Sequence, residues 1–287
     1  MNGYYRVKHG LKLIRWRIRR VRAALRWGAD ALAAAPIVFG NAMPKSGSHL
    51  LTQVLEGLEH LGPFVNPGFP PVNRTEANEP LPEDAVIAAI RRMQPGDIRY
   101  GYIHACEPYL SLLTQKNRAT VFIYRDPRDM LVSHVFYATD MYSGHGMHQF
   151  YTRSLDSMEA RLNAAIQGVT KPGAELASVR QRYQTYWNWF DDPHILRVRF
   201  EDLILERDAT LGRILDYLKD FGFTPAKSRS QAVDVLKAGI APRKSGTFRK
   251  GEPGNWRQHF TEANKELFKD VAGDLLIRLG YEKSNDW

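Results

Sequence analysis

The sequence predicts a three-layer α/β fold, with a central parallel sheet of four or five strands between helices. Short apolar runs suited to buried strands alternate with amphipathic stretches suited to helices. The connections between the first three strands are long enough to contain helices, as parallel pairing requires. The predicted strands lie at 37–39, 98–104, 119–124 and 195–200, and the predicted helices at 50–58, 82–93, 108–116, 127–138, 155–167, 175–191, 208–221, 227–238 and 262–279.

The segment PIVFGNAMPKSGSHLLTQVLEGLEHL, residues 36–61, predicts a strand, a tight turn and a helix that together cradle a phosphate. Gly47 lets the backbone approach a ligand, and the helix start offers free N–H groups and a positive dipole end to an anion. Lys45 adds a point charge beside them. The ATP-binding P-loop pattern fits less well, because Gly40 lies only five residues before the lysine and Pro44 replaces the glycine that precedes it.

The net charge of +9 is concentrated near the start of the chain. Nine of the 40 Lys/Arg residues fall within 1–28, which contains none of the 31 Asp/Glu residues. The remainder is balanced, so the sequence does not predict a nucleic-acid partner. Cys106 is the only cysteine, which excludes an internal disulfide and favours a reducing compartment, here the cytoplasm.

Residues 1–28 predict a basic amphipathic helix with one apolar stripe. Three roles remain open: docking on an anionic membrane, pairing with another subunit in a homo-oligomer, or packing on the domain that follows. No apolar run approaches the roughly 18 residues that a membrane span needs, so any membrane contact is expected to be peripheral, at the cytoplasmic face. We therefore divide the chain into a docking helix, 1–28, and one domain, 29–287. The stripe consists of Val7, Leu11, Ile14, Ile18, Val21 and Leu25.

Two further polar clusters follow predicted elements. Arg125 comes directly after the strand at 119–124, at the carboxyl edge of the sheet, where α/β proteins bind ligands. Ser133 lies one to two turns into the helix that follows. Together with Lys45, these clusters imply a ligand that carries phosphates at both ends. The second cluster, in the loop 239–256, contains Arg243, Lys244, Arg249 and Lys250.

Three segments, in this order, resemble motifs of the PAPS-dependent sulfotransferases. PKSGS at 44–48 is similar to the 5′-phosphosulfate loop of that family, and YRDPRDMLVS at 124–133 to its 3′-phosphate motif. FRKGEPGNW at 248–256 is similar to its RKG-x-x-G-[DN]-W motif. The resemblance covers about 36–280. It implies a P-loop-like fold and an enzyme that transfers a sulfuryl group from 3′-phosphoadenylyl sulfate (PAPS) to a hydroxyl or amino group, leaving PAP, without a metal.

The resemblance also implies residue roles. Lys45 would stabilise charge on the leaving phosphate during in-line transfer. His104, 21 residues before Arg125, would be the general base that takes a proton from the acceptor. The implied cofactor-binding residues are Lys45, Ser46, Gly47, Ser48 and His49 for the 5′-phosphosulfate, and Arg125, Ser133, Arg249, Lys250 and Gly251 for the 3′-phosphate.

Several positions depart from residues that are usual in this family. Leu50 stands where many members have a tryptophan under the adenine, so the stacking residue is unassigned. Tyr102 replaces a lysine two residues before the candidate base. Gln53 replaces the glutamate that Golgi members use, which favours the histidine as base, although Glu56 lies one turn further on. Glu262 replaces a valine of the dimer motif, so dimerisation through that segment is not predicted.

Two other functions remain open. One is an ATP-dependent phosphotransferase, and the other is a non-catalytic membrane- or partner-binding protein with a degenerate sulfotransferase domain. The acceptor could be a small molecule, a lipid or a glycan, and the sequence does not specify it. The proline-rich loop 62–82 and the loop 139–150 are expected to border its site, because loops over the sheet edge usually set specificity.

Overall fold

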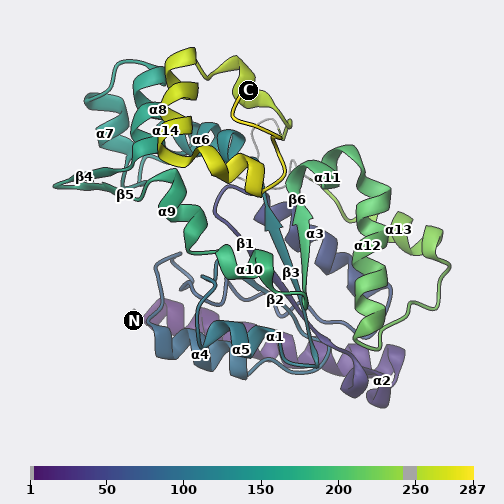
Figure 1. The fold of residues 1–287 in the computed structure, drawn as a ribbon. Helices are drawn as coiled ribbons and strands as arrows, with labels where there is room; N and C mark the ends of the chain where they lie inside the picture. Colours follow the sequence, from purple (N-terminus) through teal and green to yellow (C-terminus); the bar gives the residue numbers. More distant parts are fainter. Residues whose placement is uncertain (1–2, 242–250) are drawn as a thin grey trace. The chain divides into compact units, whose positions relative to one another are not determined.

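The computed structural model describes residues 3–241 and 251–287 (Figure 1). Its main sheet has four strands in the order β2-β1-β3-β6, and every neighbouring pair is parallel. The predicted three-layer α/β fold with a parallel sheet of four or five strands is therefore confirmed. The strands are β1 (Ile37–Ala42), β2 (Ile98–Gly101), β3 (Arg118–Tyr124) and β6 (Ile195–Arg199).

The chain folds into two compact units. Within the described residues, unit 1 comprises 3–124 and 188–241 and contains the parallel sheet. Unit 2 comprises 125–187 and 251–287 and consists mainly of helices. The division of the chain into a docking helix, 1–28, and one further domain stays a prediction.

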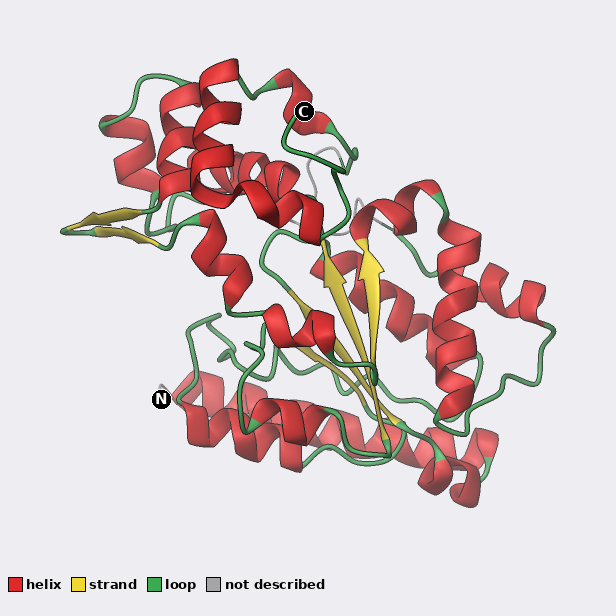
Figure 2. Ribbon diagram, viewed as in Figure 1, coloured by secondary structure: helices red, strands yellow, loops and turns green. Residues whose placement is uncertain are grey.

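Helices cover both faces of the sheet in unit 1, which is why β1 and β3 are buried along their whole length (Figure 2). Val121 on β3 belongs to the main apolar core, together with residues of α3, α12 and α13. Phe122 points to the opposite face, where it meets the ring of Phe190 edge-on. The helices of this unit are α1 (Gly3–Trp27), α2 (Ala29–Ala34), α3 (Ser48–Glu56), a 3-10 turn (Gly57–His60), α4 (Glu83–Arg91), α5 (Tyr109–Leu113), α11 (Phe200–Leu205), α12 (Arg207–Asp220) and α13 (Arg229–Ala238).

Unit 2 is held together around its long last helix. Thr261 and Asn264 form a capping box at the start of that helix, and the Asn264 amide also donates to Asn163 Oδ1 at 2.7 Å. A short antiparallel hairpin projects from the same unit. The elements are α6 (Pro127–Phe136), a π-helical turn (Tyr137–Met141), α7 (His148–Arg153), α8 (Met158–Gln167), β4 (Val169–Lys171), β5 (Ala174–Leu176), α9 (Val179–Gln184), a 3-10 turn (Asn255–Gln258) and α14 (Glu262–Arg278), while α10 (Trp187–Asp191) runs into unit 1.

The predicted single helix over 175–191 is wrong. Gly173, with φ +78°, closes the turn of the β4–β5 hairpin, so the chain before residue 177 is extended rather than helical. Ser178 then starts α9 with a capping box to Gln181. The helix ends at Gln184, and α10 begins separately three residues later.

The proline-rich segment 62–82 contains no regular helix or strand, as predicted, but it packs closely on the rest of unit 1. Val65 forms a single bridge to Asp97, and Val72 is buried and donates its N–H to the Tyr100 carbonyl at 2.9 Å. These contacts fix the segment beside β2.

Helix α1 packs on the rest of unit 1, which was one of its three predicted roles, but it uses the side opposite the apolar stripe. The Trp16 indole and the Arg20 guanidinium each donate to Asp97 Oδ1 at 2.9 Å, and Ala23 is buried in a small cluster with Leu32 and Val65. Burial raises the pKa of Asp97, although hydrogen bonds from Gln94, Trp16 and Arg20 oppose that shift. Within the described residues, no helix combines the length and the apolar character required to cross a bilayer.

We predict that Asp97→Ala lowers the free energy of unfolding by about 2–4 kcal/mol, because it leaves two donors of α1 without their shared buried acceptor. Urea denaturation measures the loss. Asp208→Ala is the matched control, since Asp208 forms a solvent-exposed ion pair with Lys237 and should contribute less than about 1 kcal/mol. Equal losses in the two variants would contradict the anchoring role of Asp97.

Candidate functional site

The turn between β1 and α3 has the backbone shape that the sequence predicts for an anion cradle. Lys45 and Gly47 both adopt left-handed conformations, with φ of +66° and +93°, and Gly47 caps the start of α3. A Cβ at position 47 would lie 2.5 Å from Phe200 Cδ2, so only glycine fits there. The turn therefore brings Lys45 to the helix start and keeps the backbone open to a ligand.

The electrostatics of this turn favour a negatively charged group. The first N–H groups of α3 have no acceptor within the helix, and its dipole adds partial positive charge. The hydroxyl of Ser46 is buried without a hydrogen-bond partner among the described residues. Partial burial and then the neighbouring Lys45 ammonium lower the pKa of His49. These features suit the binding of an anionic group.

The backbone before and after His104 is held by side chains from two other parts of unit 1, β1 and α10. Asn41 on β1 accepts from the Ile103 N–H at 2.9 Å and donates to the Ile103 carbonyl at 3.0 Å. Trp189 donates to the same carbonyl at 2.8 Å, and Asn188 donates to the Ala105 carbonyl at 3.0 Å. The backbone on both sides of His104 is thus fixed.

Tyr102 joins the His104 segment to the phosphate-type turn. Its hydroxyl lies 3.0 Å from Ser48 Oγ at the start of α3. Its backbone is held by Asn73, which accepts from the Tyr102 N–H at 3.2 Å and donates to its carbonyl at 2.8 Å. The contact between Tyr102 and Ser48 therefore links two segments that the sequence predicted separately, the turn at 44–48 and the segment that carries His104.

The protonation state of His104 suits a proton acceptor. Burial lowers its pKa, so the neutral imidazole predominates at neutral pH. Its position, three residues beyond the end of β2, lies at the carboxyl edge of the parallel sheet. A neutral imidazole at this edge can take a proton from a hydroxyl or an amine.

Gln53 and Glu56, the two other positions on α3 considered for a base, form hydrogen bonds that give them structural roles. The Gln53 amide accepts from the N–H of Ala241 and donates to its carbonyl, each at 3.0 Å. Glu56 accepts from the Asn66 side chain at 2.5 Å and helps to hold the proline-rich segment. Burial and then Glu59 raise the pKa of Glu56. Among these groups, His104 remains the best candidate for a base.

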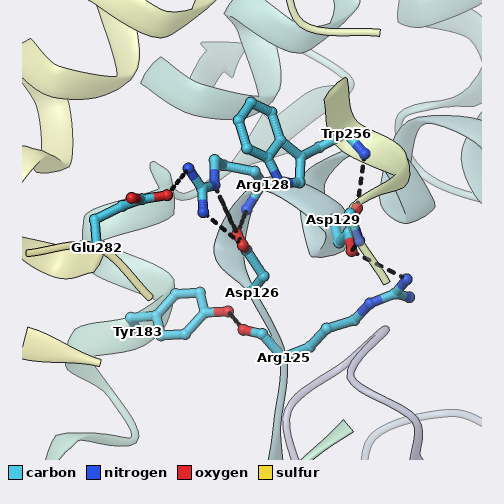
Figure 3. Close-up of polar contacts among 8 residues, drawn as sticks. Arg125, Asp126, Arg128, Asp129, Tyr183, Trp256 and Glu282 are labelled. Carbon is cyan, nitrogen blue, oxygen red and sulfur yellow. Dashed lines mark hydrogen bonds and ion pairs between the residues drawn. The ribbon is translucent and has the colours of Figure 1, made fainter. Parts of the chain in front are cut away.

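In unit 2, Arg125 is held at the start of α6 (Figure 3). Tyr183 is fully buried, and its hydroxyl donates to the Arg125 carbonyl at 2.6 Å. The Arg125 guanidinium donates to the Glu252 carbonyl at 3.5 Å, which brings it beside Gly251, a residue with φ of +66°. Ser133 is half-buried, about two turns further along the helix. Arg249 and Lys250 lie outside the described residues.

The remaining charges of the Arg-Asp-Pro-Arg-Asp run have structural roles (Figure 3). Asp126 caps α6 by accepting from the Arg128 N–H at 2.9 Å and also binds the Arg128 guanidinium at 2.7 Å. That guanidinium is buried, donates to Glu282 and stacks between the rings of Trp256 and Trp287. Burial alone would lower the pKa of Arg128, but the two carboxylates raise it.

Asp129, on α6, forms hydrogen bonds with the third of the predicted motifs. Its carboxylate accepts from the N–H groups of Gly254 and Trp256 at 2.7 and 2.8 Å, and it lies 3.7 Å from the Arg125 guanidinium. Burial raises its pKa, while Arg125 opposes that shift. Asp129 therefore positions both the arginine and the segment that follows Gly251.

Sequence reasoning missed the residues that position the site. Three side chains donate hydrogen bonds to backbone carbonyls of residues 103–105: those of Asn41, Asn188 and Trp189. In each of these hydrogen bonds the two partners lie far apart in the sequence. A buried asparagine at the end of an apolar strand was the one available signal, because such a group must find hydrogen-bond partners.

We predict that Asn41→Ala lowers the free energy of unfolding by about 1–3 kcal/mol, because the buried Ile103 N–H loses its acceptor. Chemical denaturation measures the change. Asn117→Ala, at an exposed position before β3, should change stability by less than about 0.5 kcal/mol. An equally small change for Asn41→Ala would show that the clamp contributes nothing.

Comparison with known proteins supports this assignment of the fold. The chain is similar to mouse sulfotransferase SULT7A1 complexed with PAP, with 18% identity and a TM-score of 0.58, over 86% of this chain and 87% of that one. It is also similar to retinol dehydratase in complex with androsterone and inactive cofactor PAP, with 16% identity and a TM-score of 0.55, over 89% and 85% of the two chains. The same protein with retinol and PAP gives 16% identity and a TM-score of 0.56, over 89% and 86%. No curated protein matches the chain significantly.

A sequence family described as "Sulfotransferase domain" matches residues 105–280. The matched region contains the motif that starts α6 and the segment that Asp129 holds, while the turn at 44–48 and His104 lie before it. Because this match extends over more than half of the sequence, the chain belongs to the sulfotransferase family.

Proposed function

We propose that this protein transfers a sulfuryl group from PAPS to a hydroxyl or amino group of an acceptor and releases PAP. Family membership supports sulfuryl transfer, and the similar structures named above contain PAP. The observation that carries the proposal is the contact of Tyr102 with Ser48, which joins the phosphate-type turn to the segment of His104. In this proposal, unit 1 contains both the site for the leaving phosphate and the base.

The 5′-phosphosulfate is proposed to bind at the start of α3. Lys45 and the N–H groups of the first turn supply positive charge, and the buried Ser46 hydroxyl supplies a further donor. Gly47 leaves room for the backbone to approach the group. Ser48 and His49 complete this set, as the motif PKSGS and the following histidine imply.

The 3′-phosphate is proposed to bind residues of unit 2. Arg125 supplies a guanidinium suited to a phosphate. Asp129 lies beside this guanidinium, and Tyr183 holds the Arg125 backbone. Ser133 and Gly251 follow from the family motifs, as do Arg249 and Lys250. A charge-assisted hydrogen bond contributes roughly 1.5–3 kcal/mol, so several such bonds can select a 3′-phosphorylated nucleotide over its plain analogue.

The proposed chemical step is an in-line displacement at sulfur. The acceptor oxygen or nitrogen forms a bond to sulfur while the bond from sulfur to the phosphate oxygen breaks. His104 takes the proton that the acceptor loses, and Lys45 stabilises the negative charge that develops on the phosphate. The clamps on residues 102–105 support this role, because a base must be held at a defined distance from its substrate.

The competing phosphotransferase function is less well supported. Pro44 occupies the place of a P-loop glycine, and the family match is to a sulfotransferase domain. A non-catalytic role is less well supported, because it gives no reason for the hydrogen bonds that hold the backbone on both sides of His104. The acceptor is proposed to contact the segment 62–82, because Asn73 of that segment holds Tyr102. It is a small molecule, a lipid or a glycan.

We predict that kcat is constant between about pH 6.5 and pH 8 and falls about tenfold per pH unit at low pH. The apparent pKa of this fall should lie below the ordinary histidine value of about 6.5. The sign follows from the lowered pKa of His104, which keeps the base neutral until the solution is more acidic. A pH profile of PAP formation measures this. His49→Gln should keep the acid limb, and His104→Gln should lose it together with most of the activity. An unchanged limb in His104→Gln would rule out this base.

We also predict that Lys45→Ala lowers kcat by about 100-fold or more, because it removes a charge that stabilises the leaving phosphate. The assay follows PAP release from PAPS with a panel of phenols, sterols, amines and glycans, by chromatography. Lys116→Ala, at an exposed position, is the control and should leave the rate unchanged. No PAP release with any acceptor from the unaltered protein, or equal rates in both variants, would count against the proposal.

A further inference from the structure

Helix α1 presents an apolar surface to solvent. Ten large apolar side chains are exposed in the part of the chain that the structure describes, and six of them lie on α1. One is Leu13, and the other five form a continuous row that we call the outer stripe. The outer stripe consists of Leu11, Ile14, Ile18, Val21 and Leu25, with exposed fractions of 51%, 55%, 47%, 59% and 83%.

The contacts on the opposite side of α1 hold the outer stripe in this orientation. An α-helix has 3.6 residues per turn, which places Trp16, Arg20 and Ala23 roughly half a turn from Ile14 and Ile18. The first two bind Asp97, and the third is buried. Burying the outer stripe on the domain would therefore require breaking these contacts.

Both edges of the outer stripe are positively charged. Arg15, Arg22 and Arg26 lie along one edge and Arg17 along the other, and all four are exposed. The helix contains no acidic residue. An exposed apolar row between arginines matches the layered chemistry of an anionic bilayer, where apolar side chains enter the acyl boundary and arginines reach the headgroups.

We propose that the outer stripe is a docking surface for an anionic membrane, on which α1 lies parallel to the bilayer plane. A second copy of the chain is a poorer occupant, because its arginines would face the same arginines without any acidic partner on the helix. The membrane supplies both the apolar layer and the negative charge that this surface requires.

The docking surface is separate from the proposed nucleotide site. Arg20 of α1 donates to Asp97 and to the Pro95 carbonyl, which lie just before β2, at the amino edge of the sheet. The helix is also held by the proline-rich segment 62–82, through an ion pair of Lys12 with Glu76 and a hydrogen bond from Arg19 to the Asn66 carbonyl. The turn with Lys45 follows β1 and lies at the carboxyl edge. Substitutions in the outer stripe should therefore change membrane binding and leave nucleotide binding intact.

The test is co-sedimentation of the full chain with vesicles of phosphatidylcholine alone or mixed with phosphatidylglycerol. We expect binding to the mixed vesicles only. Ile14→Gln combined with Ile18→Gln should lower the partition coefficient at least tenfold. Replacing Arg15 and Arg22 by glutamine should lower the partition coefficient about fivefold per arginine. Added salt should also lower the partition coefficient.

Leu205→Gln is the matched control, because Leu205 is 72% exposed on α11 and lies outside the outer stripe. It should bind like the unaltered protein. The thermal melting temperature reports folding, and it should be unchanged in all variants because the replaced side chains are exposed. Equal binding to both vesicle types, equal losses in Leu205→Gln and the stripe variant, or a concentration-dependent dimer that the stripe variant abolishes would each overturn the proposal.

Discussion

The proposed site in unit 1 depends on one buried polar side chain, Asn41. It lies on β1, which leads directly into the phosphate-type turn, and its amide pairs with both backbone polar groups of Ile103. The same strand therefore positions the turn at one end and the neighbour of His104 through its side chain. A buried amide that forms two hydrogen bonds tolerates little displacement, since an unpaired polar group in the core is costly. Tyr102 adds a direct link between the two segments.

Unit 2 uses acidic groups to hold basic ones in place. Asp126 binds the buried Arg128, and Asp129 binds the N–H groups of Gly254 and Trp256 while lying close to Arg125. Only one arginine of the Arg-Asp-Pro-Arg-Asp run is therefore a candidate for ligand binding. The other charges shape the segment that carries the third family motif. This division explains why so many charged residues occur in one buried region without mutual repulsion.

The sequence predicted all four parallel strands, most clearly β1 and β3, which are buried along their whole length. The end of β2 was placed too late, because this strand stops at Gly101 and not at residue 104. The turn at 44–48 was equally clear, since glycine, lysine and a following helix have direct physical roles. The clamps on residues 102–105 were not predictable, because hydrogen bonds such as the one from Trp189 to Ile103 join positions far apart in the chain. The hairpin at 169–176 was missed because its strands have only three residues each.

Helix α1 shows a second limit of sequence reasoning. Its periodicity correctly predicted an amphipathic helix, but an apolar stripe does not reveal which side meets the rest of the protein. Trp16 packs on the domain through its ring and donates its N–H to Asp97, so an aromatic residue and an arginine form the inner side instead of the aliphatic row. A buried acidic acceptor made the polar side of this helix the better one to bury.

The most direct test of the central claim is thermal unfolding of the protein with PAP, with adenosine 5′-phosphate and with Mg-ATP. A ligand at about 100 times its Kd stabilises the folded state by about 2.7 kcal/mol. We expect a clear rise in Tm with PAP and a much smaller one with adenosine 5′-phosphate, because only PAP carries the 3′-phosphate proposed to bind Arg125. A rise with Mg-ATP alone, or no rise with PAP, would contradict that claim.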